Sequence, residues 1–228
     1  MNKIISLRNI SKSFLLNKNI KVLKKINYDF KKGKIYSLMG PSGSGKSTLL
    51  NIISLIDKPT SGFIILDKNN VNFNNSSNND KVRANKIGIV YQQNNLLPDF
   101  TALENIYLAK LSISNDKKKA LSAAENIINK MGLLKRKNHY PSELSGGEIQ
   151  RFSIARALIN DPDIILADEP TGSLDHETTK DVFKILYELK NSSRVIIYAT
   201  HNRFFANMAD CKLELIDGNI KTINAKNK

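Results

Sequence analysis

The sequence is poor in the residues that build disulfide frameworks and membrane spans. It contains a single cysteine, Cys211, among 228 residues. One cysteine excludes an internal disulfide and is typical of a reducing compartment, so Cys211 is expected to be a small core residue rather than a nucleophile. No apolar run approaches the roughly 20 residues that a membrane-spanning helix requires. Arg8 and Lys12 interrupt the only apolar stretch near the N-terminus, so a secretory signal is not expected there.

Acidic residues are scarce in the first part of the chain. Residues 1–48 contain eleven Lys or Arg and one acid, Asp29, and the whole chain has a formal net charge of +14. This excess favours nucleic acid, anionic lipid or nucleotide as a partner, but it also fits a Lys- and Asn-rich composition on solvated faces. Charge alone therefore selects no function. The 41 % hydrophobic content and the length suit one globular α/β domain with a substantial core.

The organising stretch is G-P-S-G-S-G-K-S-T at residues 40–48. It matches the phosphate-binding loop pattern G-x-x-x-x-G-K-[ST] at every fixed position. Glycines let backbone N–H groups turn toward phosphate oxygens, Lys46 places a cation near the β- and γ-phosphates, and the Ser47 hydroxyl can bind Mg²⁺. A strand predicted at residues 34–39 and a helix predicted at residues 48–53 give the loop its expected context. The predicted nucleotide site comprises Gly40, Pro41, Ser42, Gly43, Ser44, Gly45, Lys46, Ser47 and Thr48.

Apolar patterns predict the order of the other elements. Strands are expected at residues 3–10, 22–30, 63–66, 86–91, 164–167 and 195–200, and helices at residues 102–111, 117–131, 148–160 and 178–190. Residues 68–80 are rich in Asn and Ser without periodic apolar residues, and we expect an exposed loop there. This order predicts an α/β fold in which a helical subdomain is inserted into a parallel-sheet core around residues 95–160.

Two further motifs carry chemistry. Asp168 and Glu169 follow the apolar strand I-I-L-A. An aspartate there commonly holds nucleotide-bound Mg²⁺, and the adjacent glutamate is placed to orient or deprotonate an attacking water; two carboxylates that cap a turn are the alternative. Upstream, L-S-G-G-E places Ser145, Gly146 and Gly147 before a helix, where hydroxyl and amide groups form either a second anion site or an ordinary helix cap.

Together, the phosphate loop, L-S-G-G-E and I-I-L-A-D-E resemble the ATP-binding subunits of ABC transporters over essentially the whole chain. The resemblance implies a P-loop NTPase (RecA-like) core with an N-terminal antiparallel β subdomain in residues 1–94 and 161–228, and a helical subdomain in residues 95–160. It also implies a head-to-tail homodimer that encloses two ATP molecules. The phosphate loop of one subunit would face Ser145 and Gly147 of the other.

The resemblance gives roles to single residues outside these motifs. Phe14 lies where the family has an aromatic residue that stacks on adenine, although a core aromatic is the alternative. Gln92 resembles the glutamine that senses Mg²⁺ and the attacking water while it contacts the membrane partner. Asp175, in Ser173-Leu174-Asp175, resembles the carboxylate of the loop that crosses to the partner subunit. His201 resembles the switch histidine at the γ-phosphate.

The implied reaction is ATP hydrolysis with Mg²⁺. In this scheme Glu169 polarises the water, while His201 and Lys46 stabilise charge on the transferred phosphoryl group. The metal-binding residues of the scheme are Ser47, Gln92 and Asp168.

The string L-L-P-D-F-T-A-L-E-N at residues 96–105 resembles, within the family, the ATP-binding subunits of lipoprotein-releasing systems, the LolD group. Macrolide-exporter and FtsE-type cell-division ATPases share much of this pattern. The resemblance implies a peripheral ATPase at the cytoplasmic side of the inner membrane. It would drive two integral-membrane permease subunits, through a surface near Gln92 and residues 96–100, and so release lipoproteins toward the outer membrane.

DNA-repair and chromosome-structural ATPases share these motifs and are the main alternative from another class. They usually carry a long coiled coil between the phosphate loop and the L-S-G-G region. Here only about a hundred residues intervene and they contain no heptads, so nucleic acid is not expected as a partner. A small-molecule kinase would leave L-S-G-G-E and the placement of His201 unexplained.

Overall fold

The structure is a computed structural model that describes residues 3–15, 19–93, 95–172 and 174–225, and these residues form two compact units. The first unit consists of Met1–Asp80, Leu166–Glu169 and Lys190–Lys228, and the second of Lys81–Ile165 and Pro170–Leu189. Within the described ranges, no helix combines the length and apolar character that crossing a bilayer requires. The first unit holds the phosphate loop, the two carboxylates after I-I-L-A, and His201, whereas the second holds L-S-G-G-E.

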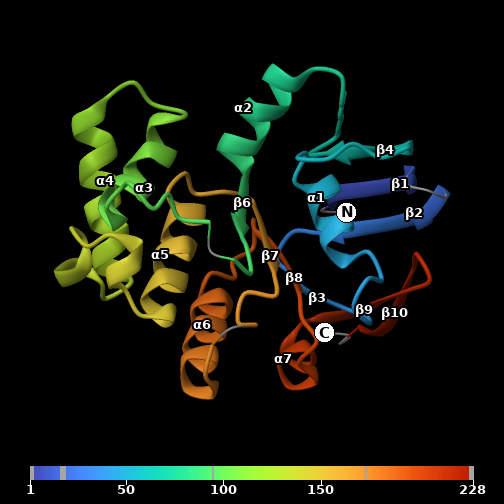
Figure 1. The fold of residues 1–228 in the computed structure, drawn as a ribbon. Coiled ribbons are helices and arrows are strands. Elements are labelled where there is room, and N and C mark those ends of the chain that lie inside the picture. The colour runs from blue at the N-terminus through green and yellow to red at the C-terminus, as the bar shows by residue number, and fades with distance from the viewer. Residues whose placement is uncertain (1–2, 16–18, 94, 173, 226–228) are drawn as a thin grey trace. The chain divides into compact units, whose positions relative to one another are not determined.

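An antiparallel four-stranded sheet begins the first unit, with the strand order β2-β1-β4-β5 (Figure 1). Its strands are β1 (Lys3–Leu15), β2 (Asn19–Lys31), β4 (Ser61–Leu66) and β5 (Asn69–Asn70). Ile5 of β1 pairs with Phe30 on one side and with Leu66 on the other, and all three side chains are buried. The predicted N-terminal antiparallel sheet is confirmed.

A second sheet has the order β10-β9-β3-β8-β7-β6. The strands are β3 (Ile35–Met39), β6 (Ile87–Val90), β7 (Ile164–Asp168), β8 (Val195–Ala199), β9 (Cys211–Ile216) and β10 (Asn219–Ala225). β3 pairs in parallel with β8 and β9, and all of β8 is buried, as is typical of a parallel strand covered on both faces. The phosphate loop, the two carboxylates and His201 lie at the carboxyl ends of β3, β7 and β8, where such sheets bind ligands.

Helices dominate the second unit, and Figure 1 shows α3, α4 and α5 grouped together. The helices are α3 (Ala102–Leu111), α4 (Lys117–Lys130), α5 (Gly146–Leu158) and α6 (His176–Glu188). Thr101 and Ser145 begin α3 and α5 with capping boxes, in which a glutamate three residues later returns a hydrogen bond. Ile106, Ile128 and Phe152 are fully buried in the apolar cluster among these helices. The inserted helices and the α/β fold predicted from the sequence are confirmed.

The expectation of an exposed loop over residues 68–80 is wrong for its second half. Helix α2 begins at Ser76 and continues to Lys86. Asn75 Oδ1 accepts a hydrogen bond from Asn78 N at 3.0 Å, and the buried Asn79 donates from Nδ2 to the Asn72 carbonyl at 3.0 Å. Asparagine side chains thus begin and anchor this helix, so it carries no apolar period. The structure also adds α7 (Arg203–Met208), β9 and β10, for which the apolar patterns made no prediction.

Candidate nucleotide-binding site

The phosphate loop connects β3 to helix α1 (Lys46–Ile53) along a path that only glycine follows easily. Gly40 and Gly45 have φ values of 152° and 101°, in the region that side chains rarely adopt. A Cβ at Gly40 would also collide with the Leu215 carbonyl oxygen of β9, and one at Gly45 would lie 2.8 Å from Val22 Cγ1. The loop is therefore fixed by its neighbours as well as by its own sequence.

Lys46 and Ser47 form the first turn of α1. No side chain in the described part of the chain caps this helix, because the N-cap is Gly45. Lys46 Nζ donates to the carbonyl oxygens of Gly40 at 2.9 Å and Pro41 at 3.1 Å, so its ammonium lies against the loop. Ser47 is exposed and Thr48 is half-buried. An uncapped helix start with an adjacent cation is an arrangement that binds phosphate groups.

Asp168 is the last residue of β7, and its environment fits a metal ion. Within the described residues, neither Asp168 Oδ1 nor Ser44 Oγ has a hydrogen-bond partner, although both atoms are buried. A buried acceptor without a partner is unfavourable, and a cation or its bound water would satisfy it. Carboxylate and hydroxyl oxygens are the ligands that Mg²⁺ prefers, so Asp168 and Ser47 suit this ion.

Glu169 and His201 are in direct contact. Glu169 has a left-handed backbone with φ 45°, and its N–H donates to the Ala199 carbonyl at the end of β8 at 3.1 Å. Its Oε2 atom lies 2.9 Å from His201 Nδ1 and 3.4 Å from His201 N. The glutamate side chain is mostly buried, whereas 74 % of the histidine side chain is exposed. The sequence placed both residues at the site but did not predict that their side chains are in contact.

In the second unit, Ser145 acts as the cap of α5. Its Oγ accepts from Glu148 N at 3.3 Å, while Glu148 Oε2 accepts from Ser145 N at 2.9 Å and from Ser145 Oγ at 3.0 Å. The hydrogen bond from the Ser145 backbone holds the pKa of Glu148 below its ordinary value. The helix-cap interpretation of Ser145 thus holds, and anion binding by Ser145, Gly146 and Gly147 stays a prediction.

The starts of α5 and α6 approach each other closely. A Cβ on Gly147 would lie 2.5 Å from Thr178 Cγ2, which explains a glycine at this position. Asp175 caps α6 by accepting from Glu177 N and Thr178 N, each at 3.0 Å, and from Thr178 Oγ1 at 2.6 Å. The Thr178 hydrogen bonds lower the pKa of Asp175. The family resemblance implies a role for Asp175 at the partner subunit, which stays a prediction, and this cap was not predicted.

The remaining predicted residues lie on other elements. Phe14 is on β1 and 39 % exposed, which rules out the core alternative for this ring. Lys12, which the sequence did not single out, places Nζ 4.9 Å from the centre of that ring. Gln92 is exposed and follows β6 in the second unit. Ser173 lies outside the described residues.

Comparisons with known proteins identify the family. The family described as ABC transporter matches residues 23–172. The lipoprotein-releasing system ATP-binding protein LolD of Rickettsia bellii is 44 % identical over 219 residues, covering 95 % of this chain and 97 % of that protein. The uncharacterized ABC transporter ATP-binding protein YvrO of Bacillus subtilis is 41 % identical over 218 residues, covering 95 % of each.

Solved structures agree with these matches. A dimeric post-hydrolysis state of the ATP-binding cassette MJ0796 bound to ADP and Pi has a TM-score of 0.89 and 36 % identity, covering 97 % of this chain and 100 % of that one. The phosphate loop before the uncapped helix α1, the carboxylate pair at the end of β7 and the L-S-G-G-E cap of α5 thus occur in the fold of an ATP-binding cassette. The chain therefore belongs to the ABC transporter family, as an ATP-hydrolysing subunit.

Proposed function

We propose that this chain is the ATPase of a lipoprotein-releasing transporter. The observation that carries the proposal is the 44 % identity to a LolD protein along 95 % of the chain. The protein would bind peripherally at the cytoplasmic side of the inner membrane, through two integral-membrane permease subunits. Its ATP hydrolysis would drive the release of lipoproteins toward the outer membrane.

The segment that would contact the permeases is residues 96–100, at the start of the L-L-P-D-F-T-A-L-E-N string. Leu97 is 46 % exposed and Phe100 is exposed as well. Asn105 of α3 accepts a hydrogen bond from Leu97 N at 2.7 Å, which fixes this segment to the helix. Two exposed apolar side chains on a fixed segment suit docking to another protein.

The phosphate loop would bind the β- and γ-phosphates, with Lys46 as the cation beside them. Ser47 and Asp168 would hold Mg²⁺, which neutralises phosphate charge when bound. Phe14 would stack on adenine with its exposed ring. Gln92 keeps its proposed role as the glutamine that responds to the metal and the attacking water.

Glu169 would act as the general base. A water oxygen attacks the γ-phosphorus, its proton passes to the Glu169 carboxylate, and the bond to the β–γ bridging oxygen breaks with its electron pair left on ADP. In the free chain this carboxylate is hydrogen-bonded to His201. The γ-phosphate would offer His201 a second anionic partner, so His201 would turn to the phosphate and leave Glu169 free for the water.

The working form would be a head-to-tail homodimer with two ATP molecules enclosed between the subunits. Ser145 and Gly147 would then face the phosphate loop of the partner subunit, and Asp175 would lie in the loop that crosses to it. The likeness to a dimeric cassette bound to ADP and Pi supports this arrangement. Closure and reopening of the dimer would move the permeases.

Replacement of Glu169 by Gln tests the catalytic assignment. The amide keeps the shape of the side chain but cannot take a proton, so the variant should bind ATP, dimerise and lose turnover by about 10²- to 10⁴-fold. Phosphate release and size-exclusion chromatography with ATP measure these effects. Glu177→Gln, the same exchange at the start of α6, is the control and should hydrolyse ATP normally. Wild-type turnover by Glu169→Gln would show that another group is the base.

Co-purification tests the cargo. The tagged chain would be isolated from gently solubilised membranes of its own cell, and its partners identified by mass spectrometry. A pair of permeases with lipoprotein supports the proposal. A single macrolide-exporter or FtsE-type permease would keep the ATPase mechanism and replace the cargo. Salt-dependent DNA binding without any permease would overturn the transport role.

A further inference from the structure

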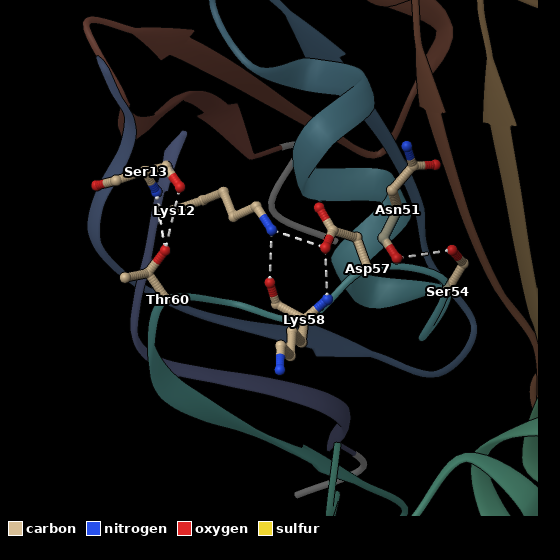
Figure 2. Close-up of polar contacts among 7 residues, drawn as sticks. All are labelled: Lys12, Ser13, Asn51, Ser54, Asp57, Lys58 and Thr60. Atoms are coloured by element: carbon tan, nitrogen blue, oxygen red, sulfur yellow. Dashed lines mark hydrogen bonds and ion pairs between the residues drawn. The ribbon is translucent and has the colours of Figure 1, made fainter. Parts of the chain in front are cut away.

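Lys12 is a nearly buried lysine with three distinct contacts. Its side chain is 11 % exposed, and Nζ donates to Asp57 Oδ1 at 2.7 Å and to the Lys58 carbonyl at 2.8 Å (Figure 2). The same atom lies 4.9 Å from the centre of the Phe14 ring. A buried ammonium is unfavourable unless its protons find partners, and here a carboxylate, a carbonyl and an aromatic face provide them.

These contacts connect the phosphate-loop helix α1 to Phe14, the ring that is proposed to stack on adenine. Asp57 follows α1, and its N–H donates to the carbonyl of Asn51, inside that helix, at 3.1 Å. Phe14 lies near the end of β1, with its ring partly exposed. The Lys12 ammonium therefore contacts both a segment that is hydrogen-bonded to α1 and the ring that would stack on the base.

A neighbouring connection between the same two segments does not involve the ring. Ser13 N donates to Thr60 Oγ1 at 3.0 Å (Figure 2). Thr60 N in turn donates to the Ser11 carbonyl at 2.8 Å. These bonds hold β1 against the start of β4 without Lys12. The role of Lys12 is therefore separable from strand pairing, and Thr60 supplies a matched control.

We propose that Lys12 is a positioning residue for the base of the bound nucleotide. It holds the Phe14 ring at a fixed distance from the phosphate-loop helix, so that the base and the phosphates of one nucleotide are bound together. Lys12 acts through Phe14, and the inference rests on the proposed stacking of adenine on that ring. Its signature is a loss of affinity for ligands that carry a base, with no loss for ligands that lack one.

ADP and inorganic pyrophosphate, each with Mg²⁺, provide this contrast in titration calorimetry. Lys12→Met keeps the unbranched stem and removes the charge. ADP affinity should fall about fivefold to twentyfold, the effect of losing a cation–π contact and the order of the ring. Pyrophosphate affinity should change by less than about twofold, which is close to the uncertainty of comparing the affinities of two variants. Thr60→Val should leave both affinities within the same margin.

Phe14→Ala separates failure of this inference from failure of the proposed adenine site. Unchanged ADP affinity in Phe14→Ala would remove Phe14 from the site, and the Lys12 inference with it. A weaker Phe14→Ala with a normal Lys12→Met would overturn the Lys12 inference alone. The double variant should bind ADP as weakly as Phe14→Ala, because Lys12 acts through the ring. If the two single variants' losses of ADP affinity add up in the double variant, the Lys12 inference is wrong. It is also wrong if Lys12→Met weakens pyrophosphate binding as much as ADP binding.

A spectroscopic measurement reports the ring directly. The sequence contains no tryptophan, so Phe14→Trp introduces a unique fluorophore. Its emission should be quenched by ADP, and the quenching should be reduced when Lys12→Met is added. Asp57→Asn, which keeps the lysine, should give the same selective loss of ADP affinity at about threefold, since it removes only one charge-assisted partner. Normal ADP affinity in Asp57→Asn together with an unfolded Lys12→Met would make Lys12 a purely structural residue and overturn the inference.

Discussion

Asn105 is the buried polar residue on which the proposed permease-facing segment depends. It is 2 % exposed, and its Nδ2 atom lies at hydrogen-bond distance from the carbonyl oxygens of Leu97, Phe100 and Thr101, at 3.0 to 3.1 Å. Its Oδ1 atom accepts from Leu97 N at 2.7 Å. One amide therefore satisfies both the donor and the acceptors of the turn that leads into α3.

Replacement of Asn105 by Ala should destabilise the protein by about 2–4 kcal/mol. The change removes the partner of Leu97 N and the donor to the carbonyls, and each buried group left unsatisfied costs about 1–3 kcal/mol. Asn105→Asp should be at least as harmful at pH 7. Its carboxylate still accepts from Leu97 N but faces carbonyl oxygens where the amide donated.

Urea unfolding gives the free energy, and native-state hydrogen exchange of the Leu97 amide reports the local opening. Asn85→Ala is the control, because Asn85 is exposed and its Nδ2 atom donates to the Lys81 carbonyl, within the same helix, at 2.8 Å. It should cost less than about 0.5 kcal/mol. A loss below about 1 kcal/mol in Asn105→Ala, with normal protection of the Leu97 amide, would refute the reasoning.

Two further predictions concern the surface and the charges. Leu97→Glu should leave nucleotide binding unchanged but weaken co-purification of the permeases. Leu121→Glu, which changes an exposed leucine of α4, should leave co-purification unchanged. If Leu97→Glu recovers as much permease as Leu121→Glu, the contact surface lies elsewhere. Burial raises the pKa of Asp29, but hydrogen bonds from neighbours that include Lys3 and Arg8 outweigh it and lower the pKa to about 2. Asp29→Asn should therefore lose about 1 kcal/mol at pH 7, after allowance for solvent screening. Since the folded pKa lies below the unfolded one, this difference should vanish as the pH falls from about 4 to 2, and a constant difference in urea titrations would contradict it.

The sequence predicted the elements whose apolar residues face a core. Helix α3 begins and ends where its pattern predicted, because Ala102 and Ile106 are buried and Thr101 caps its start. Helix α2 has no such face, since its one buried residue is Asn79. Hydrogen bonds of asparagine side chains replace apolar packing there, and no hydrophobic period records them.

Motifs predicted the identity of the candidate site residues but not their contacts. The spacing G-x-x-x-x-G-K-S requires a loop before a helix, and in the structure such a loop at residues 40–45 leads into α1. Nothing in the sequence joins Lys12 to Asp57, because 45 residues separate them and the pairing depends on how β1 packs beside the end of α1. Long-range contacts of this kind follow from tertiary packing alone.

In Asp168 and Glu169, a backbone turn gives two adjacent carboxylates different surroundings. Successive side chains of a strand point to opposite faces. If β7 continued, the Glu169 side chain would therefore point to the opposite face of the sheet from Asp168. Instead β7 ends at Asp168, and Glu169 takes a left-handed conformation that costs about 1–3 kcal/mol for a residue with a side chain. The Glu169 N–H donates to the Ala199 carbonyl and its carboxylate contacts His201, so the turn connects the ends of β7 and β8.

The two carboxylates have different neighbours. Asp168 keeps a buried oxygen without a partner within the described residues, which suits a cation, while Glu169 contacts the histidine that follows the neighbouring strand. The strained backbone of Glu169 therefore lies at the point where the proposed Mg²⁺ ligand, Asp168, is followed by the proposed general base.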